Sequence, residues 1–220
     1  MRSPTGRFDE VARRRITEAV RGAERETSAE IVTYVVGRCD AYAETDWAAA
    51  VAGGGLGLLA GLLFPQISGS WAAASPILLA YAVVLGAAAG WALVAVPAIR
   101  RLFVPNHVLD GRSQVRAEAA FLEEEVFATH DRVGVLMFLA LFERRCVVMG
   151  DSGVLAAVPA EALEEPVRLA CEGMRGGHPV EGVLAGIEAC RRLLASSGLV
   201  SAPRELDDDE LPDDPRVRDR

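Results

Sequence analysis

One charge-free stretch, residues 47–99, decides the architecture of this protein: WAAAVAGGGLGLLAGLLFPQISGSWAAASPILLAYAVVLGAAAGWALVAVPAI. It runs for 53 residues without a single Asp, Glu, Lys, Arg or His. Charged residues make up 25% of the 220-residue chain, and all of them lie outside this stretch. A single soluble domain of ordinary composition does not contain such a gap. The sequence therefore predicts a membrane segment enclosed by water-exposed parts.

The charge-free stretch divides at a turn-rich segment between Pro65 and Pro76. Before it, residues 47–64 form an apolar run that would be about 27 Å long as a helix. After it, residues 77–99 form a second run, about 35 Å long by the same rise per residue. The hydrocarbon core of a bilayer is about 30 Å thick, so both runs are long enough to cross it. We expect a two-helix transmembrane hairpin in contact with the lipid bilayer.

Arginines predict the orientation of this hairpin. The connecting segment carries no charge, whereas Arg100 and Arg101 follow the second run directly, with Arg112 and Arg116 close behind. Positively charged residues next to membrane spans stay on the cytoplasmic side. We therefore expect a multi-pass protein of the plasma (inner) membrane with both termini in the cytoplasm.

Small residues recur every fourth position on both runs: Gly53, Gly57 and Gly61 on the first, and Ala82, Gly86 and Gly90 on the second. Such faces let two helix backbones approach closely within a bilayer. Packing of the hairpin on itself is the favoured interpretation, and a homodimer through the glycine-rich faces is the alternative. A transport pathway is not indicated, because neither run contains an ionisable group.

The charged remainder predicts an α/β domain that the hairpin splits into residues 8–40 and 107–197. Apolar residues at helical spacing predict a helix from Phe8 to Ala23, and three β-branched or apolar runs predict strands at residues 31–36, 133–142 and 146–149. A further helix, with Val115, Ala119, Leu122 and Val126 on its apolar face, should end near residues 129–131. Two more helices follow, at residues 160–174 and 180–194. We expect a small mixed sheet with helices on both faces, the first two strands parallel and the third antiparallel to the second.

The last twenty residues, 201–220, hold eight acidic residues against four arginines and are interrupted by prolines. This composition predicts a disordered acidic tail. The net charge of the whole chain is −8, which argues against nucleic acid as a partner.

Two aspartates are the candidate metal ligands. Asp151 follows the third strand in a glycine-flanked turn, and Asp40 follows the first strand. If the two strands shared an edge, these carboxylates could hold a divalent cation such as calcium and support a weak, metal-assisted phosphatase. The competing interpretation, which we favour, is that Asp151 only forms a turn.

Other reactive residues show no catalytic spacing. Cys39, Cys146, Cys171 and Cys190 form no CxxC pair and are expected to be reduced thiols in or near the core, and His107, His130 and His178 have no metal-ligand spacing. Residues 143–145, Glu-Arg-Arg, are interpreted as a solvated turn rather than a phosphate clamp. Nucleophile-elbow, phosphate-loop and HExxH motifs are absent from the sequence, so no cofactor is expected.

Several strand and turn motifs resemble the TPM-domain family. They are Thr27–Val32 (TSAEIV), Asp131–Leu136 (DRVGVL), Glu143–Val148 (ERRCVV), Gly150–Val154 (GDSGV) and Gly182–Ile187 (GVLAGI). The resemblance implies a compact α/β domain tied to membranes. Members have been assigned to the upkeep of membrane protein complexes, to receptor modulation, and in some cases to acid phosphatase activity or calcium binding. This chain differs from the commoner layout, a lumenal or secreted domain with one terminal anchor, because its hairpin is nested within the domain.

These observations lead to two functional hypotheses. The first is an integral membrane protein with a cytoplasmic TPM-like domain that binds or regulates a membrane protein complex without catalysis. The second is the metal-assisted phosphatase, which needs several converging carboxylates where the sequence offers one well-placed candidate. We expect the first.

Overall fold

A computed structural model describes residues 4–68, 75–199 and 211–219. The chain forms two compact units: Met1–Asp40 with Leu109–Arg220, and the intervening Ala41–Val108. The first is the α/β unit and the second is the helical hairpin unit. Each is described below by itself.

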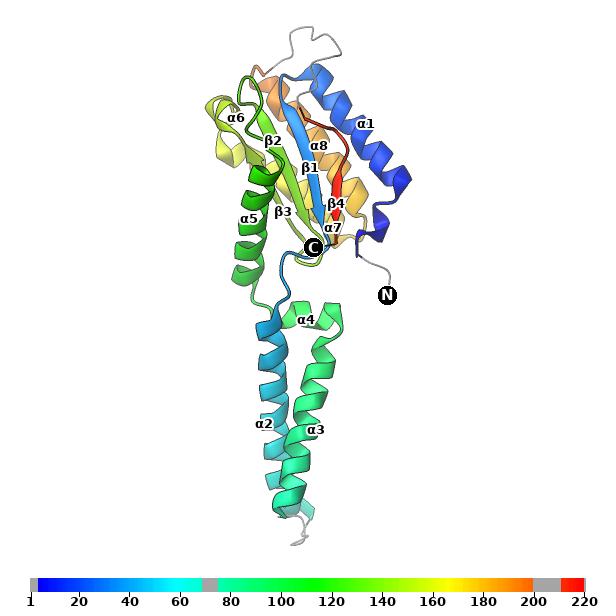
Figure 1. Ribbon diagram of the computed structural model, residues 1–220, viewed down its shortest axis with the longest axis vertical. Coiled ribbons are helices and arrows are strands. Elements are labelled where there is room, and N and C mark those ends of the chain that lie inside the picture. Colours follow the sequence, from blue (N-terminus) through cyan, green and yellow to red (C-terminus); the bar gives the residue numbers. More distant parts are fainter. Residues whose placement is uncertain (1–3, 69–74, 200–210, 220) are drawn as a thin grey trace. The chain divides into compact units, whose positions relative to one another are not determined.

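A four-stranded mixed sheet forms the centre of the α/β unit (Figure 1), in the order β3-β2-β1-β4. Strands β1 (Glu30–Val36) and β2 (Gly134–Ala140) pair in parallel along their whole length. Strand β3 (Arg145–Gly150) is antiparallel to β2, and β4 (Arg216–Arg218) is parallel to β1. The α/β class and the pairing of the three expected strands are confirmed.

Strand β4 corrects the prediction of a disordered tail. Residues 211–219 are ordered against the sheet, and three of them pair with β1. The composition of the tail concealed this, because a three-residue strand is stabilised by its partner rather than by an apolar run of its own. The remainder of the predicted tail, residues 201–210 and 220, lies outside the described residues.

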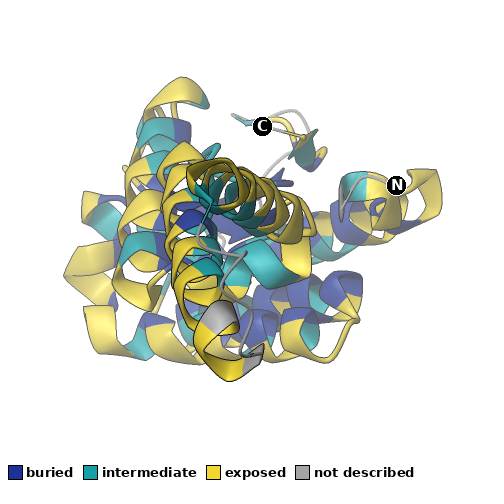
Figure 2. Cartoon of the chain, turned by 90° about the horizontal axis from the view of Figure 1, so that it is seen from below, coloured by how far each residue is buried: buried dark blue, intermediate teal, exposed yellow. Residues whose placement is uncertain are grey.

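Helices cover both faces of the sheet, as expected. All residues of β1 and β2 are therefore buried. The helices of this unit are η1 (Pro4–Arg7), α1 (Glu10–Glu26), α5 (Asn106–Glu123), α6 (Ser152–Ala157), η3 (Ala160–Leu163), α7 (Glu164–Arg175) and α8 (Pro179–Ser196). Helices α1, α7 and α8 pack on one face through a core that includes Ile16, Val183 and Ile187, and α5 packs on the other face through Ala117 and Ala120. In Figure 2 the segments toward the interior appear dark blue, and the outward sides of the helices appear yellow.

Helix α5 differs from its predicted form. It ends at Glu123, before residues 129–131, and it buries Leu109, Ser113, Ala117 and Ala120. Val115 and Leu122, expected on its apolar face, are exposed. Small residues form the true packing face because they let the helix lie close to the sheet.

The hairpin unit contains two long apolar helices, α2 (Ala43–Ser68) and α3 (Pro76–Val94). Both are long and apolar enough to cross a membrane, and only 6% of the apolar part of each is buried within the protein. Helix α2 extends beyond the predicted run of residues 47–64 at both ends and includes the start of the expected turn segment. Helix α3 ends five residues earlier than predicted, and residues 97–103 form a separate helix, α4 (Pro97–Phe103). The break occurs because a residue before proline disfavours the helical conformation, and Val96 is indeed extended.

The glycine-rich faces of α2 and α3 meet each other. A methyl group added at Gly57 would lie 2.1 Å from the carbonyl oxygen of Ala82, and one at Gly53 would lie 2.2 Å from that of Gly86. The backbones are therefore closer than any residue with a side chain allows. This is the self-packing interpretation of the glycine pattern. A homodimer through the same faces would require the two helices to separate.

Candidate functional site

The structure places the two candidate metal ligands at opposite ends of the sheet. Asp40 follows the carboxyl end of β1. Asp151 follows Gly150 of β3, which pairs with Val135 near the amino end of β2. Because β1 and β2 run in parallel for seven residues, about 20 Å of strand separates the two aspartates. The expectation that they share a cation site is therefore wrong, since the antiparallel β3 carries Asp151 away from the edge where Asp40 lies.

Each aspartate instead has an arginine partner. The carboxylate of Asp151 accepts a hydrogen bond from the backbone N–H of Ser152 at 2.7 Å, which caps α6. The Nε of Arg132 lies 2.7 Å from Oδ2 of the same carboxylate. Asp40 pairs with the Nε of Arg112 at 3.0 Å. These contacts give both aspartates structural roles and supply the positive charge that a cation would otherwise bring.

The other residues that the sequence singled out do not form a metal centre. His107, His130 and His178 are exposed, at the start of α5, before β2 and before α8 respectively. Within residues 4–68, 75–199 and 211–219, no three His, Cys, Asp or Glu side chains are grouped to hold a metal ion.

The 143–145 turn is only partly solvated. Glu143 is fully buried, and its Oε1 accepts a hydrogen bond from the backbone N–H of Cys39 at 2.9 Å. It therefore holds the loop that leaves β1, which corrects the interpretation of this residue as part of a solvated turn.

All four cysteines are free thiols. Burial raises the pKa of Cys190 to about 12 and raises the pKa of Cys146 well above its ordinary value. Since the thiolate is the nucleophile, these two residues are chemically inert core residues, as the sequence led us to expect.

An apolar hollow of about 580 Å³ lies beside β3, between this strand and α7. Val148, Leu155, Leu163 and Val167 contribute to its lining, together with Arg168 and other residues. Among the described residues, the charged side chains that line it are those of Glu164, Arg168 and Arg175, and they do not by themselves indicate a particular chemistry.

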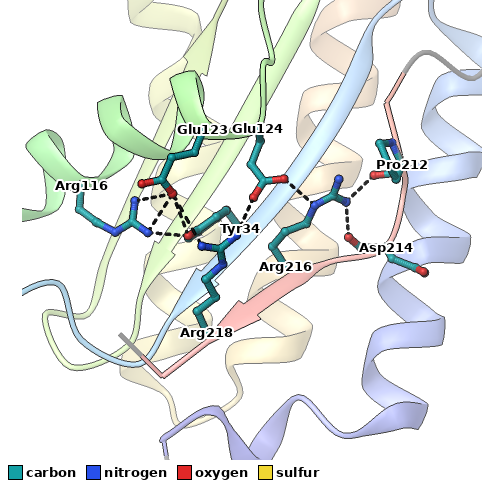
Figure 3. Close-up of polar contacts among 8 residues, drawn as sticks. All are labelled: Tyr34, Arg116, Glu123, Glu124, Pro212, Asp214, Arg216 and Arg218. Atoms are coloured by element: carbon teal, nitrogen blue, oxygen red, sulfur yellow. Dashed lines mark hydrogen bonds and ion pairs between the residues drawn. The ribbon is translucent and has the colours of Figure 1, made fainter.

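The most elaborate polar arrangement was not predicted from the sequence. We call it the C-terminal clamp: Tyr34 of β1, Arg116, Glu123 and Glu124 of α5 and the turn after it, and Arg216 and Arg218 of β4 (Figure 3). Glu124 lies between the two arginines of β4. Its Oε2 is 2.9 Å from the Nε of Arg216, and its Oε1 is 3.3 Å from the Nη2 of Arg218. Only 12% of the Glu124 side chain and 18% of the Arg216 side chain are exposed, so solvent screens this pair less than a surface ion pair.

Tyr34 lies at the centre of the clamp and is fully buried. The guanidinium groups of Arg116 and Arg218 lie 5.1 and 5.4 Å from the centre of its ring, distances typical of cation–π contacts. The Nη2 of Arg116 donates a hydrogen bond to the Tyr34 hydroxyl at 2.5 Å, and the same guanidinium bonds Glu123 at 3.2 Å. Burial raises the pKa of Tyr34, whereas the two arginines lower it. The clamp thus ties the end of the chain to β1 and α5.

A second polar group holds the same segment on its other side. Asp213, which is buried, pairs with the Nε of Arg21 at 2.6 Å, and Asp214 accepts a hydrogen bond from the Thr17 hydroxyl at 3.1 Å. Glu24 lies close to Asp213, and burial raises its pKa to about 9, with the Glu30 and Asp213 charges acting in the same direction. Glu24 is therefore protonated at neutral pH, which avoids a second negative charge beside the buried Asp213.

Sequence signals for the clamp existed but were short. Arg216 and Arg218 alternate around Val217, which is the spacing of a strand with one charged face, and Glu123–Glu124 supplies the opposite charge. Nothing in the sequence showed that segments 92 positions apart would meet.

Comparison with known proteins supports the fold alone. No protein-family model matches the chain, and no curated protein sequence matches it. A similar solved structure is the NMR structure of the BA42 protein from the psychrophilic bacterium Bizionia argentinensis. It has 18% sequence identity over 95% of this chain and 94% of that chain, with a TM-score of 0.54.

Proposed function

We propose that this chain is an integral membrane protein whose TPM-like α/β unit is a cytoplasmic binding or regulatory module acting on a membrane protein complex. The hairpin carries this proposal. Its two apolar helices are exposed over almost their whole apolar length. At Gly53 and Gly57 they pack so closely on each other that no side chain would fit. Exposed apolar surface of this extent needs an apolar solvent, and lipid provides it.

The charges of the hairpin unit support the cytoplasmic orientation. Asp46, near the start of α2, pairs with Arg100 of α4 at 2.7 Å, and the Nη1 of Arg100 also donates to the carbonyl oxygen of Ala41 at 3.3 Å. The charges at the two ends of the hairpin are therefore gathered at one end of the unit. With Arg101 beside them, this end is the one that the positive-inside rule assigns to the cytoplasm of a plasma (inner) membrane protein.

A non-catalytic role agrees with the chemistry of the described side chains. The two carboxylates that would serve a phosphatase lie at opposite ends of the sheet, and each is neutralised by an arginine. No observation favours the phosphatase alternative. Purified protein should neither release phosphate from a phosphate ester nor gain thermal stability on addition of calcium, and Asp151→Asn should change neither result. Phosphate release that Asp151→Asn abolishes would support the phosphatase instead.

Membrane insertion and orientation can be tested together. The protein should stay in the membrane pellet after alkaline carbonate extraction. In intact cells, a membrane-impermeant maleimide should label Ser75→Cys, between the two helices, and should leave Ser196→Cys unlabelled until the membrane is opened. The wild-type protein controls for its own thiols. Extraction into the soluble fraction, or labelling of Ser196→Cys from outside, would contradict the proposal.

A further inference from the structure

Strand β4 is a small addition to an otherwise complete sheet. It forms three register pairs with β1, whereas β2 forms seven. Leu211 and Val217 are only partly buried against the two cores. A polar hollow of about 390 Å³, lined in part by Asp214 and Pro215, lies between this segment and α1. Polar contacts therefore hold β4 more than apolar burial does, and part of the segment, at Asp214 and Arg218, is open to water.

The groups that receive β4 belong to the rest of the unit and remain when the strand leaves. Glu123 lies at the end of α5, Glu124 lies in the turn after it, and Tyr34 lies on β1. Without β4, the Glu124 carboxylate would lose both Arg216 and Arg218, together with the charge-assisted hydrogen bonds that they donate. The site therefore favours occupation by a positively charged strand.

The backbone of β1 adds a second requirement. The N–H of Gly37, just beyond β1, donates to the carbonyl oxygen of Arg218 at 2.8 Å, and removal of β4 would leave this edge of β1 unpaired. An extended segment that adds to a sheet edge satisfies such groups, and its alternate side chains reach one set of pockets. A strand with arginines at alternate positions therefore fits this edge of β1.

We propose that this edge of β1, with Tyr34, Glu123 and Glu124, is an acceptor site for an extended basic segment of a partner membrane protein, and that β4 occupies it until displaced. The partner segment would carry arginines two positions apart and run parallel to β1. Cytoplasmic segments next to membrane spans are enriched in Arg and Lys, so the acidic site matches the segments that a membrane-bound neighbour presents. The identity of the partner rests on the proposed function, whereas the acceptor site itself does not.

A peptide-binding experiment on the full-length protein in detergent tests the site. The probe is a dye-labelled peptide, Gly-Ser-Pro-Arg-Val-Arg-Ser-Gly, followed by fluorescence anisotropy. In the variant Arg216→Glu, β4 places a negative charge opposite Glu124 and should leave the site. This variant should therefore bind the probe at least about ten-fold more tightly than the wild type, in which β4 competes with the probe. Arg192→Glu makes the same charge change on an exposed face of α8 and should behave like the wild type.

Specificity is tested from both sides of the contact. Replacing both arginines of the probe by alanine, or adding Glu124→Gln to the Arg216→Glu variant, should weaken binding by about ten- to a hundred-fold, since each removes charge-assisted hydrogen bonds. Hydrogen exchange at the Gly37 amide gives an independent readout. Exchange should accelerate in Arg216→Glu and slow again when the probe is added, which also shows that the variant is folded.

Three results would overturn the proposal. One is equal binding of the probe to the wild type and to Arg216→Glu, and another is undiminished binding of the alanine probe. The third is co-purification of two differently tagged wild-type copies that Arg216→Glu abolishes, because the occupant would then be a second copy of this chain. Failure of membrane insertion with intact probe binding would instead remove only the membrane partner and leave the acceptor site in place.

Discussion

Replacing Gly57 by alanine is the smallest change that tests the packing of the hairpin. A methyl group at this position would lie 2.1 Å from the carbonyl oxygen of Ala82, and real contacts of this kind essentially never fall below 3.0 Å. The helices must therefore separate by about 0.9 Å, which would loosen the contacts along the whole glycine face. Overpacking of this kind typically costs about 1 to 3 kcal/mol.

Gly55 provides a matched control on the same helix, because a methyl group added there meets no atom within 4 Å. Both substitutions raise helix propensity by the same amount, up to about 1 kcal/mol, so their difference isolates the contact between the helices. We expect Gly57→Ala to lower the free energy of hairpin unfolding by about 1 to 3 kcal/mol relative to Gly55→Ala.

The three tryptophans of the chain make this measurement specific, because all of them lie within residues 47–99. Their fluorescence during titration with SDS in mixed micelles reports the hairpin unit and not the α/β unit. Equal transition midpoints for Gly57→Ala and Gly55→Ala would refute the close approach of α2 and α3. Protease digestion of the same two proteins shows whether the strain reaches the α/β unit, which the nested arrangement predicts, or stays within the hairpin unit.

Further predictions concern the α/β unit. Burial raises the pKa of Glu24 to about 9, so between pH 4.5 and 9 the folded state holds a proton that the unfolded state has lost. The free energy of unfolding should therefore fall as pH rises through this window, by at most about 1.4 kcal/mol per pH unit. In urea titrations at pH 6 and 8.5, Glu24→Gln should reduce this dependence on pH. An equal pH dependence in the wild type and the variant would contradict the prediction. Asp151→Ala should lower the free energy of unfolding in urea by about 1 to 2 kcal/mol, because α6 loses its N-terminal cap. Asp151→Asn keeps an acceptor oxygen and should lower it by less. Equal losses for the two variants would show that the cap is unimportant. Iodoacetamide at pH 8 should modify Cys146 and Cys190 only after unfolding in urea, as read by mass spectrometry; modification of the folded protein would mean that the core opens.

The sequence predicted those parts of the fold that depend on long apolar patterns. The charge-free stretch marked the hairpin, and the uninterrupted apolar run at residues 133–142 marked a strand buried on both faces. The parallel pairing of β1 and β2 followed from the helix between them. Strand β4 was missed, because Arg216–Arg218 carries one apolar residue and becomes a strand only through its contacts with β1 and Glu124.

The candidate site was predicted less well, because it depends on which end of the sheet each loop reaches. Asp40 and Asp151 both follow strands, and only the antiparallel direction of β3 sends them to opposite ends. The favoured interpretation of Asp151 as a turn residue agrees with its role as the cap of α6. The clamp combines residues 34, 116–124 and 216–218, and no local spacing connects segments so far apart in the chain.

The pairing of β1 with β2 also determines when the protein can fold during synthesis. Glu30 pairs with Gly134, so the ribosome makes 104 further residues, including both apolar helices, before β1 meets its principal partner. A loop of this length is slow to close, unless its middle is already compact. The hairpin unit supplies that compactness once α2 and α3 have packed on each other, since Arg100 of α4 then donates a hydrogen bond to the Ala41 carbonyl group just before α2. Until then β1 has no partner strand, so a chain whose hairpin unit has not formed presents an unpaired amino-terminal segment to cellular proteases.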